Sequence, residues 1–152
     1  MSDIKKNFKV TIDGIVDFFP EGTTILKAAD KLGIRIPTLC FDERISISGA
    51  CRLCSVEVKG NPVLVPACAF PIYHGIEIYT HSPKVVRARK TILELLLANH
   101  PRDCLICVRN GNCELQSLAE EYGLREWRWT GETRENPVDE SSTAIRRDPE
   151  KC

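Results

Sequence analysis

The N-terminal part of the chain shows the pattern of a hairpin followed by a helix. Apolar and polar residues alternate over residues 8–12, and Asp13-Gly14 supplies a turn before a second apolar run over residues 15–19. A helical pattern follows over residues 25–32, after a threonine that can cap it, and Gly33 predicts its end. These residues therefore predict two antiparallel strands and one short helix.

Three more strands are predicted before residue 81. They cover residues 55–59, 63–65 and 76–80, and the Gly60-Asn61-Pro62 sequence gives a turn between the first two. Strands that wrap around one helix, with a long loop between that helix and the later strands, form a β-grasp fold. We therefore expect an α+β protein whose first domain covers residues 1–81.

The second half of the chain is predicted to be helical. Ser82-Pro83 is typical of a helix start, and Gly123 ends a further helix predicted over residues 114–122. An apolar stripe in the first helix is expected to face a core, and it consists of Val86, Ile92, Leu93, Leu96 and Leu97. The basic residues of that helix are expected on a solvated face, and they are Lys84, Arg87, Arg89 and Lys90. We expect a small helical domain over residues 82–123, then an irregular tail over residues 124–152 that contains Trp127 and Trp129.

Eight cysteines change this picture, because seven of them fall into two groups. The first group has the spacing C-x10-C-x2-C-x13-C and consists of Cys40, Cys51, Cys54 and Cys68. Four thiolates suit a 2Fe-2S cluster or a zinc ion. The small residues Gly49 and Ala50 favour the cluster, because a loop that wraps inorganic sulfide needs close backbone approach. Zinc remains the alternative, although its four-thiolate sites usually contain two close cysteine pairs and this group contains one.

The second group holds three cysteines within ten residues and a histidine just before them. Its members are His100, Cys104, Cys107 and Cys113. A lone histidine at a helix end is more often a cap or a solvated side chain. Here Pro101 stops the helix and fixes the chain direction, so the imidazole can complete a 4Fe-4S site. A zinc site made by the same histidine and three cysteines is the competing interpretation.

The composition of the chain limits the partners and the cellular compartment that can be expected for it. Twenty-one basic and twenty-one acidic residues cancel, which gives no general attraction to nucleic acid or anionic membrane. No apolar run is long enough to span a bilayer, and the N-terminus has no apolar region of a secretory signal. We therefore expect a cytoplasmic protein with no direct membrane insertion. In that reducing compartment, clustered thiols are better explained as metal ligands than as disulfides.

The two motifs together resemble a known family. The first cysteine group, followed by His100-x3-Cys104-x2-Cys107-x5-Cys113 and the sequence Cys113-Glu114-Leu115-Gln116, is similar to the N-terminal iron-sulfur region of several enzymes. These are the large iron-sulfur subunit of complex I, the NAD-linked and electron-bifurcating iron-only hydrogenases, and some formate dehydrogenases. The segment from residue 139 to Cys152 most resembles the hydrogenase branch, where it leads into a two-cluster ferredoxin domain.

The resemblance implies a β-grasp 2Fe-2S ferredoxin domain followed by a small helical 4Fe-4S domain whose ligands are one histidine and three cysteines. It implies one-electron relay within a multi-subunit NAD(P)-linked hydrogenase, with flavin/NAD(P)-binding and other iron-sulfur subunits as partners. Complex I, an NAD-reducing nickel-iron hydrogenase and a formate dehydrogenase are the alternatives, and a structural zinc-binding module is an alternative of another class. The chain has no nucleotide-binding glycine motif and no paired catalytic carboxylates, so we expect no catalysis by this chain alone. Cys152 would be the first ligand of a missing ferredoxin domain and is not counted as a ligand here.

Overall fold

The computed structural model describes residues 6–126, 128–129 and 137–149. The chain divides into two compact units, Met1–Ile92 and Leu93–Cys152, which are described separately. The helix that joins them belongs partly to each. The domain boundaries predicted from the sequence, at residues 81 and 123, stay predictions.

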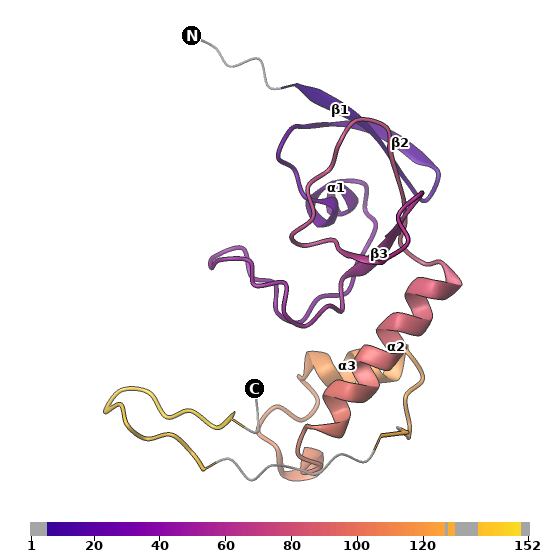
Figure 1. Cartoon of the computed structure of the whole chain (residues 1–152). Helices are drawn as coiled ribbons and strands as arrows, with labels where there is room; N and C mark the ends of the chain where they lie inside the picture. Colours follow the sequence, from indigo (N-terminus) through magenta and orange to yellow (C-terminus); the bar gives the residue numbers. More distant parts are fainter. Residues whose placement is uncertain (1–5, 127, 130–136, 150–152) are drawn as a thin grey trace. The chain divides into compact units, whose positions relative to one another are not determined.

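The first unit contains a mixed five-stranded sheet, one short helix and the first part of the joining helix (Figure 1). Its order is β2-β1-β5-β3-β4, with β1 and β5 parallel and the other neighbours antiparallel. Its elements in chain order are β1 (Asn7–Ile12), β2 (Ile15–Pro20), α1 (Ile25–Lys31), β3 (Ser55–Val58), β4 (Val65–Pro66) and β5 (Ile76–Tyr79). The predicted α+β architecture and its strands are therefore present, with small shifts at their ends.

The predicted turns and caps of this unit are confirmed. Asp13 and Gly14 both have positive φ, as a tight hairpin turn between β1 and β2 requires. The Thr24 hydroxyl accepts a hydrogen bond from the Lys27 N–H and so caps α1, and Gly33 follows with φ +72°. Local sequence signals therefore account for where these elements begin and end.

The predicted strand over residues 63–65 is wrong in its position. The Asn61 side-chain oxygen accepts a hydrogen bond from the Val63 N–H at 3.1 Å, which prolongs the preceding turn. Val63 is consequently exposed, and β4 begins only at Val65. It pairs with β3 through Ser55 opposite Pro66 and Val56 opposite Val65.

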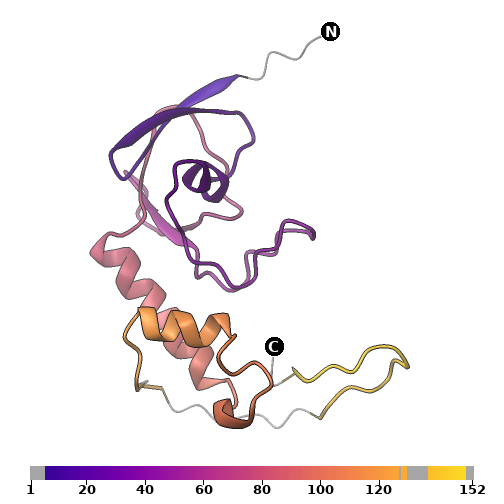
Figure 2. The same ribbon diagram turned by 180° about the vertical axis from the view of Figure 1, so that it is seen from behind.

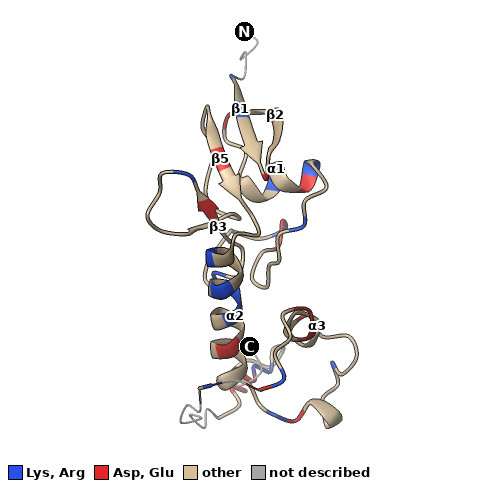
Figure 3. Cartoon of the chain, turned by 90° about the vertical axis from the view of Figure 1, so that its right-hand side faces the viewer, with Lys and Arg blue, Asp and Glu red and all other residues tan. Residues whose placement is uncertain are grey.

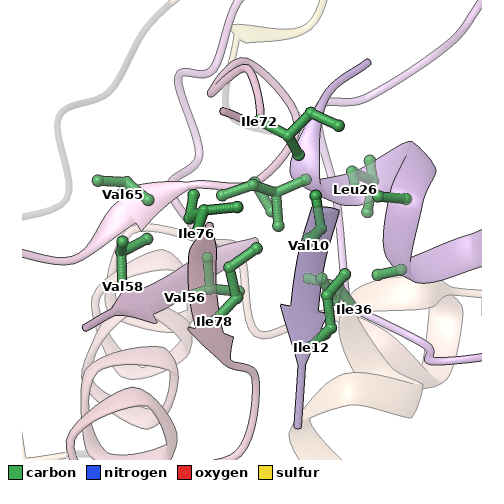
Figure 4. Packing of buried hydrophobic residues seen from close by; sticks show 14 of the residues in the cluster. Val10, Ile12, Leu26, Ile36, Val56, Val58, Val65, Ile72, Ile76 and Ile78 are labelled. Carbon is green, nitrogen blue, oxygen red and sulfur yellow. The ribbon is translucent and has the colours of Figure 1, made fainter. Parts of the chain in front are cut away.

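The core of the first unit lies between α1 and the sheet (Figure 4). Alternate residues of β1, β3 and β5 point inward, and the buried face of α1 packs on them. The central members are Val10, Ile12, Ile25, Ala28, Ala29, Val56, Val58, Ile76 and Ile78. Burial of these side chains fixes the frame from which the first cysteine loop extends.

The second unit contains the end of α2 (Pro83–Ala98), a short 3-10 helix η1 (Cys104–Ile106) and α3 (Glu114–Glu121). Leu93, Leu118 and Leu124 are buried apolar residues of this unit. Glu94 is also buried, and its carboxylate accepts hydrogen bonds from the Arg128 guanidinium at 2.8 and 3.0 Å. This ion pair holds the segment after α3 against the end of α2.

Two expectations about α2 need correction. Val86, expected in the core, is 40% exposed, and Val85 is fully buried in its place. Arg89, expected on a solvated face, is fully buried, whereas Lys84, Arg87 and Lys90 are exposed. Figure 3 shows the basic residues concentrated in the first half of the helix. Residues 85, 89 and 93 are spaced four apart and share one helical face, so the buried face includes Leu93 as expected but contains Val85 instead of Val86 and also takes in Arg89.

Candidate metal centres

The first cysteine group lies on and around a long loop between α1 and β3. The two arms of this loop run side by side and project from the sheet in both views (Figures 1 and 2). Gly49 has φ +61° and Arg52 has φ +59°, so the chain reverses direction on either side of Cys51. The Cys51 N–H donates to the Cys40 Sγ at 3.5 Å. The loop therefore brings the first two cysteines together although ten residues separate them.

The other two cysteines of this group are anchored in the core. Cys54 and Cys68 are 2% and 1% exposed. The Cys54 carbonyl accepts from the Ala67 N–H at 3.1 Å, and the Ala67 carbonyl accepts from the Leu26 N–H at 2.9 Å. Cys68 is thereby held by the β3–β4 pairing and by the first turn of α1.

The pKa values of three of these thiols are shifted by burial and by their neighbours. Burial raises the pKa of Cys68 to about 12, and interactions with Cys54, Cys40 and Cys51 act in the same direction. Burial also raises the pKa of Cys51. Burial acts to raise the pKa of Cys40 as well, but hydrogen bonds from the Cys51 and Ala50 backbone and from neighbouring side chains outweigh it and lower the pKa. Joint ionisation of clustered thiols is unfavourable unless a positive charge compensates them, and the iron of a cluster would supply that charge.

All four members of the second group line one small cavity of about 30 Å³. Leu97 from α2 and Leu115 and Gln116 from α3 contribute to its wall. The cavity therefore brings together residues from the segment after α2, the connecting loop and the start of α3. The structure thus places His100 on the wall of the same cavity as the three cysteines, and its role as a ligand stays a prediction.

Successive tight turns shape the loop that carries these donors. The Cys104 carbonyl accepts from the Cys107 N–H at 3.3 Å, and the Cys107 carbonyl accepts from the Asn110 N–H at 3.0 Å. Gln116 braces the next turn, because its side-chain oxygen accepts from the Gly111 N–H at 3.2 Å and its amide donates to Asn110 at 3.1 Å. Gln116 was not predicted as a site residue, and only its place in the Cys-Glu-Leu-Gln sequence pointed to it.

The two centres differ in exposure. Leu53, between the close cysteines of the first group, is fully buried, whereas both residues between the close cysteines of the second group, Leu105 and Ile106, are 93% and 84% exposed. Cys104 is itself exposed. The first centre is therefore built against a hydrophobic core, while the second lies in a loop with little apolar cover.

Both donor sets fit an iron-sulfur cluster by their chemistry. Thiolates hold such clusters, and an imidazole replaces a thiolate in some of them. Within the ranges that the structure describes, no three His, Cys, Asp or Glu side chains form a group that could hold a single metal ion. In those same ranges, no helix is long and apolar enough to cross a membrane. Trp127 and Cys152 lie outside the described residues.

A mixed sheet around one helix, with four cysteines on a wrapping loop and its neighbours, defines a ferredoxin-type iron-sulfur domain. The sequence comparisons agree with this class. Residues 5–83 match the 2Fe-2S iron-sulfur cluster binding domain family, and residues 89–128 match the NADH-ubiquinone oxidoreductase-G iron-sulfur binding region. The chain therefore belongs to the 2Fe-2S iron-sulfur cluster binding domain family and continues into a 4Fe-4S region of the NADH-ubiquinone oxidoreductase-G type. The predicted fold class is confirmed.

Similar proteins come from two kinds of enzyme complex. The NADP-reducing hydrogenase subunit HndD of Solidesulfovibrio fructosivorans is 47% identical over 148 residues, which cover 94% of this chain and 25% of that protein. The NADH-ubiquinone oxidoreductase 75 kDa subunit of Reclinomonas americana is 46% identical over 114 residues, which cover 75% of this chain and 16% of that protein. The chain thus spans a quarter or less of the length of these curated relatives.

A solved NAD+-reducing [NiFe]-hydrogenase in its H2-reduced state aligns with a TM-score of 0.84 and 32% identity. This alignment covers 95% of the present chain and 61% of that one. These relatives belong by name to hydrogenases and to an NADH-ubiquinone oxidoreductase. Together with the two matched iron-sulfur families, they confirm the expectation of an iron-sulfur electron-transfer subunit at that level.

Proposed function

We propose that this chain is an iron-sulfur electron-relay module with one 2Fe-2S and one 4Fe-4S cluster. Cys40, Cys51, Cys54 and Cys68 would hold the first cluster, and His100 with Cys104, Cys107 and Cys113 the second. The observation that carries the proposal is the gathering of all four members of the second group around one cavity, in a region that matches a 4Fe-4S family. The hydrogen bond from the Cys51 N–H to the Cys40 Sγ, and the effect of Cys54, Cys40 and Cys51 on the pKa of Cys68, support the first assignment.

When bound, the clusters supply reversible one-electron storage without any bond chemistry on a substrate. The chain's own residues bind and tune them. The thiolates contribute negative charge, and the Cys51 N–H opposes part of that charge by donating to the Cys40 Sγ. Burial of Leu53, Cys54 and Cys68 excludes water from one side of the first centre. His100 contributes a neutral ligand, which favours a higher potential at the second centre than a fourth thiolate would.

We assign the module to an NAD(P)-linked hydrogenase of the iron-only type. The support is the extent of the match: similarity to the NADP-reducing hydrogenase subunit covers 94% of the chain, whereas similarity to the 75 kDa subunit of the NADH-ubiquinone oxidoreductase covers 75%. Flavin/NAD(P)-binding and other iron-sulfur subunits would be the partners, and the chain would not catalyse a reaction by itself. A cytoplasmic location is part of the same proposal.

An NAD-reducing nickel-iron hydrogenase is the second candidate. The solved enzyme of this type covers 95% of the chain at a TM-score of 0.84, so the structural likeness is as extensive as the sequence likeness to the first candidate. Complex I is a third candidate, with the shorter match described above.

The experiment that separates these candidates is purification of the native assembly by an affinity tag on this chain. Hydrogen-dependent NADP+ reduction by an assembly without nickel supports the iron-only assignment. Stoichiometric nickel would instead support the NAD-reducing nickel-iron hydrogenase. NADH oxidation by quinone without hydrogen activity would support complex I. Zinc without inorganic sulfide would contradict all three.

A further inference from the structure

Arg89 is a fully buried charged residue at the first centre. It lies on α2, and its Nε and Nη2 both donate to the Ser55 carbonyl, at 3.2 and 2.9 Å. Arginine is rarely fully buried, because removal of its charge from water is expensive. A guanidinium kept in such a place is therefore held for a structural or electrostatic reason.

Ser55 is the residue that closes the turn carrying two of the proposed cluster ligands. It follows Cys54 directly, and its N–H and hydroxyl both donate to the Arg52 carbonyl, at 3.2 and 2.6 Å. Arg52 itself has the left-handed backbone that lets the loop reverse after Cys51. Arg89 thus hydrogen-bonds from α2 to the backbone at the end of the Cys51–Cys54 turn.

Several residues close in sequence to the two partners of this contact are buried. Leu53, Val56 and Val85 are fully buried, and Cys54 is 2% exposed. A charge in such surroundings acts more strongly on its neighbours than a charge in water. The acidic side chain on β3 is Glu57, and its carboxylate accepts a hydrogen bond from the Ser82 hydroxyl.

We infer that Arg89 is a positioning residue of the first centre, and that its buried guanidinium fixes the Cys51–Cys54 turn and raises the reduction potential there. The inference rests on the proposed function, because it concerns the cluster assigned to this centre. Reduction adds one negative charge to the centre, and a fixed positive charge nearby stabilises the reduced form relative to the oxidised form.

The test is a redox titration of Arg89→Met in the whole chain, followed by EPR, with dithionite as the reductant. Dithionite dissociates at its S–S bond into two sulfur dioxide radical anions. Each donates one electron and is oxidised to sulfite, and that electron reduces one ferric ion of the cluster to ferrous without breaking a bond of the cluster. We expect the equilibrium constant for reduction of the 2Fe-2S centre to fall about tenfold or more, and tenfold corresponds to about 59 mV for one electron. Arg87→Met is the matched control, because Arg87 is exposed on the same helix, and it should leave the potential unchanged.

Arg89→Lys separates charge from geometry. Lysine keeps the positive charge but lacks the two guanidinium N–H groups that donate to the Ser55 carbonyl. The reduction potential of the 2Fe-2S centre in Arg89→Lys should therefore lie closer to that of the unaltered chain than to that of Arg89→Met. An unchanged potential in Arg89→Met with a retained 2Fe-2S signal would overturn the inference. If Arg89→Met cannot hold the cluster, the result for Arg89→Lys tests the inference. A retained 2Fe-2S signal near the original potential in Arg89→Lys supports the inference, and loss of the cluster in both variants overturns it. Absence of iron and sulfide from the unaltered chain would instead defeat the proposed function itself.

Discussion

Two leucines in equivalent motifs give the sharpest prediction about the two centres. Leu53 lies within Cys51-Arg52-Leu53-Cys54 and is fully buried, whereas Leu105 lies within Cys104-Leu105-Ile106-Cys107 and is 93% exposed. Leu53→Ala removes three buried carbons, which at about 0.8 kcal/mol each correspond to about 2.4 kcal/mol of lost transfer free energy. The cavity left behind raises the expected loss of unfolding free energy to about 3 kcal/mol or more. Leu105→Ala removes the same atoms from solvent and should change it by less than about 0.5 kcal/mol.

The assay is urea unfolding of the as-isolated chain, followed by far-UV circular dichroism, with iron release to a chelator measured in parallel. Leu53→Ala should shift the unfolding transition of the first unit to lower urea and speed loss of iron from the 2Fe-2S centre. Leu105→Ala should do neither. A Leu53→Ala loss below about 1 kcal/mol, or an equal loss in both variants, would refute the claim that only the first centre is built against the core.

Three further predictions concern charge and hydrogen bonding. The hydrogen bond from Lys59 holds the pKa of Glu77 below its usual range, so the stability that this carboxylate contributes is present above its unfolded pKa and lost as pH falls through its lower folded pKa. Glu77→Gln should therefore flatten the acid side of a plot of thermal midpoint against pH, and an unaltered slope would contradict this. Gln116→Leu removes the brace on the Gly111 N–H and should speed iron loss from the 4Fe-4S centre several-fold, with the 2Fe-2S signal serving as the internal control. His100→Cys replaces a neutral ligand with an anionic one and should lower the 4Fe-4S potential in an EPR titration, whereas an unchanged potential would remove the histidine from the ligand set.

Much of the fold followed from local signals in the sequence. Asp13-Gly14 marked the first hairpin, Thr24 and Gly33 marked the ends of α1, and Ser82 caps α2 by accepting from the Val85 N–H at 3.3 Å. These features depend on residues within a few positions of one another. A single sequence therefore carries enough information to place them.

Arg89 and Glu94 could not be placed in this way. Their burial depends on partners distant in the chain, a backbone carbonyl at Ser55 and a guanidinium at Arg128. Charged residues in a helix are ordinarily expected to face solvent, so the pattern of α2 favoured the wrong face for Arg89. The Asn61 side chain similarly displaced the start of β4 through one hydrogen bond.

The membership of the candidate centres stays a prediction, made because cysteine spacing identifies metal-binding groups. Their different settings were not predictable, since Cys51-Arg52-Leu53-Cys54 and Cys104-Leu105-Ile106-Cys107 look alike in sequence. Only the structure shows that one leucine reaches the core and the other reaches solvent. The role of Gln116 as a brace also depends on its contact with a turn five residues earlier.

The most direct test of the central claim is metal and sulfide analysis of the chain purified without oxygen, together with EPR during stepwise reduction. The account predicts about six iron and about six sulfide per chain, with separable 2Fe-2S and 4Fe-4S signals. Stoichiometric zinc with no inorganic sulfide would contradict it and would make the chain a structural metal-binding module.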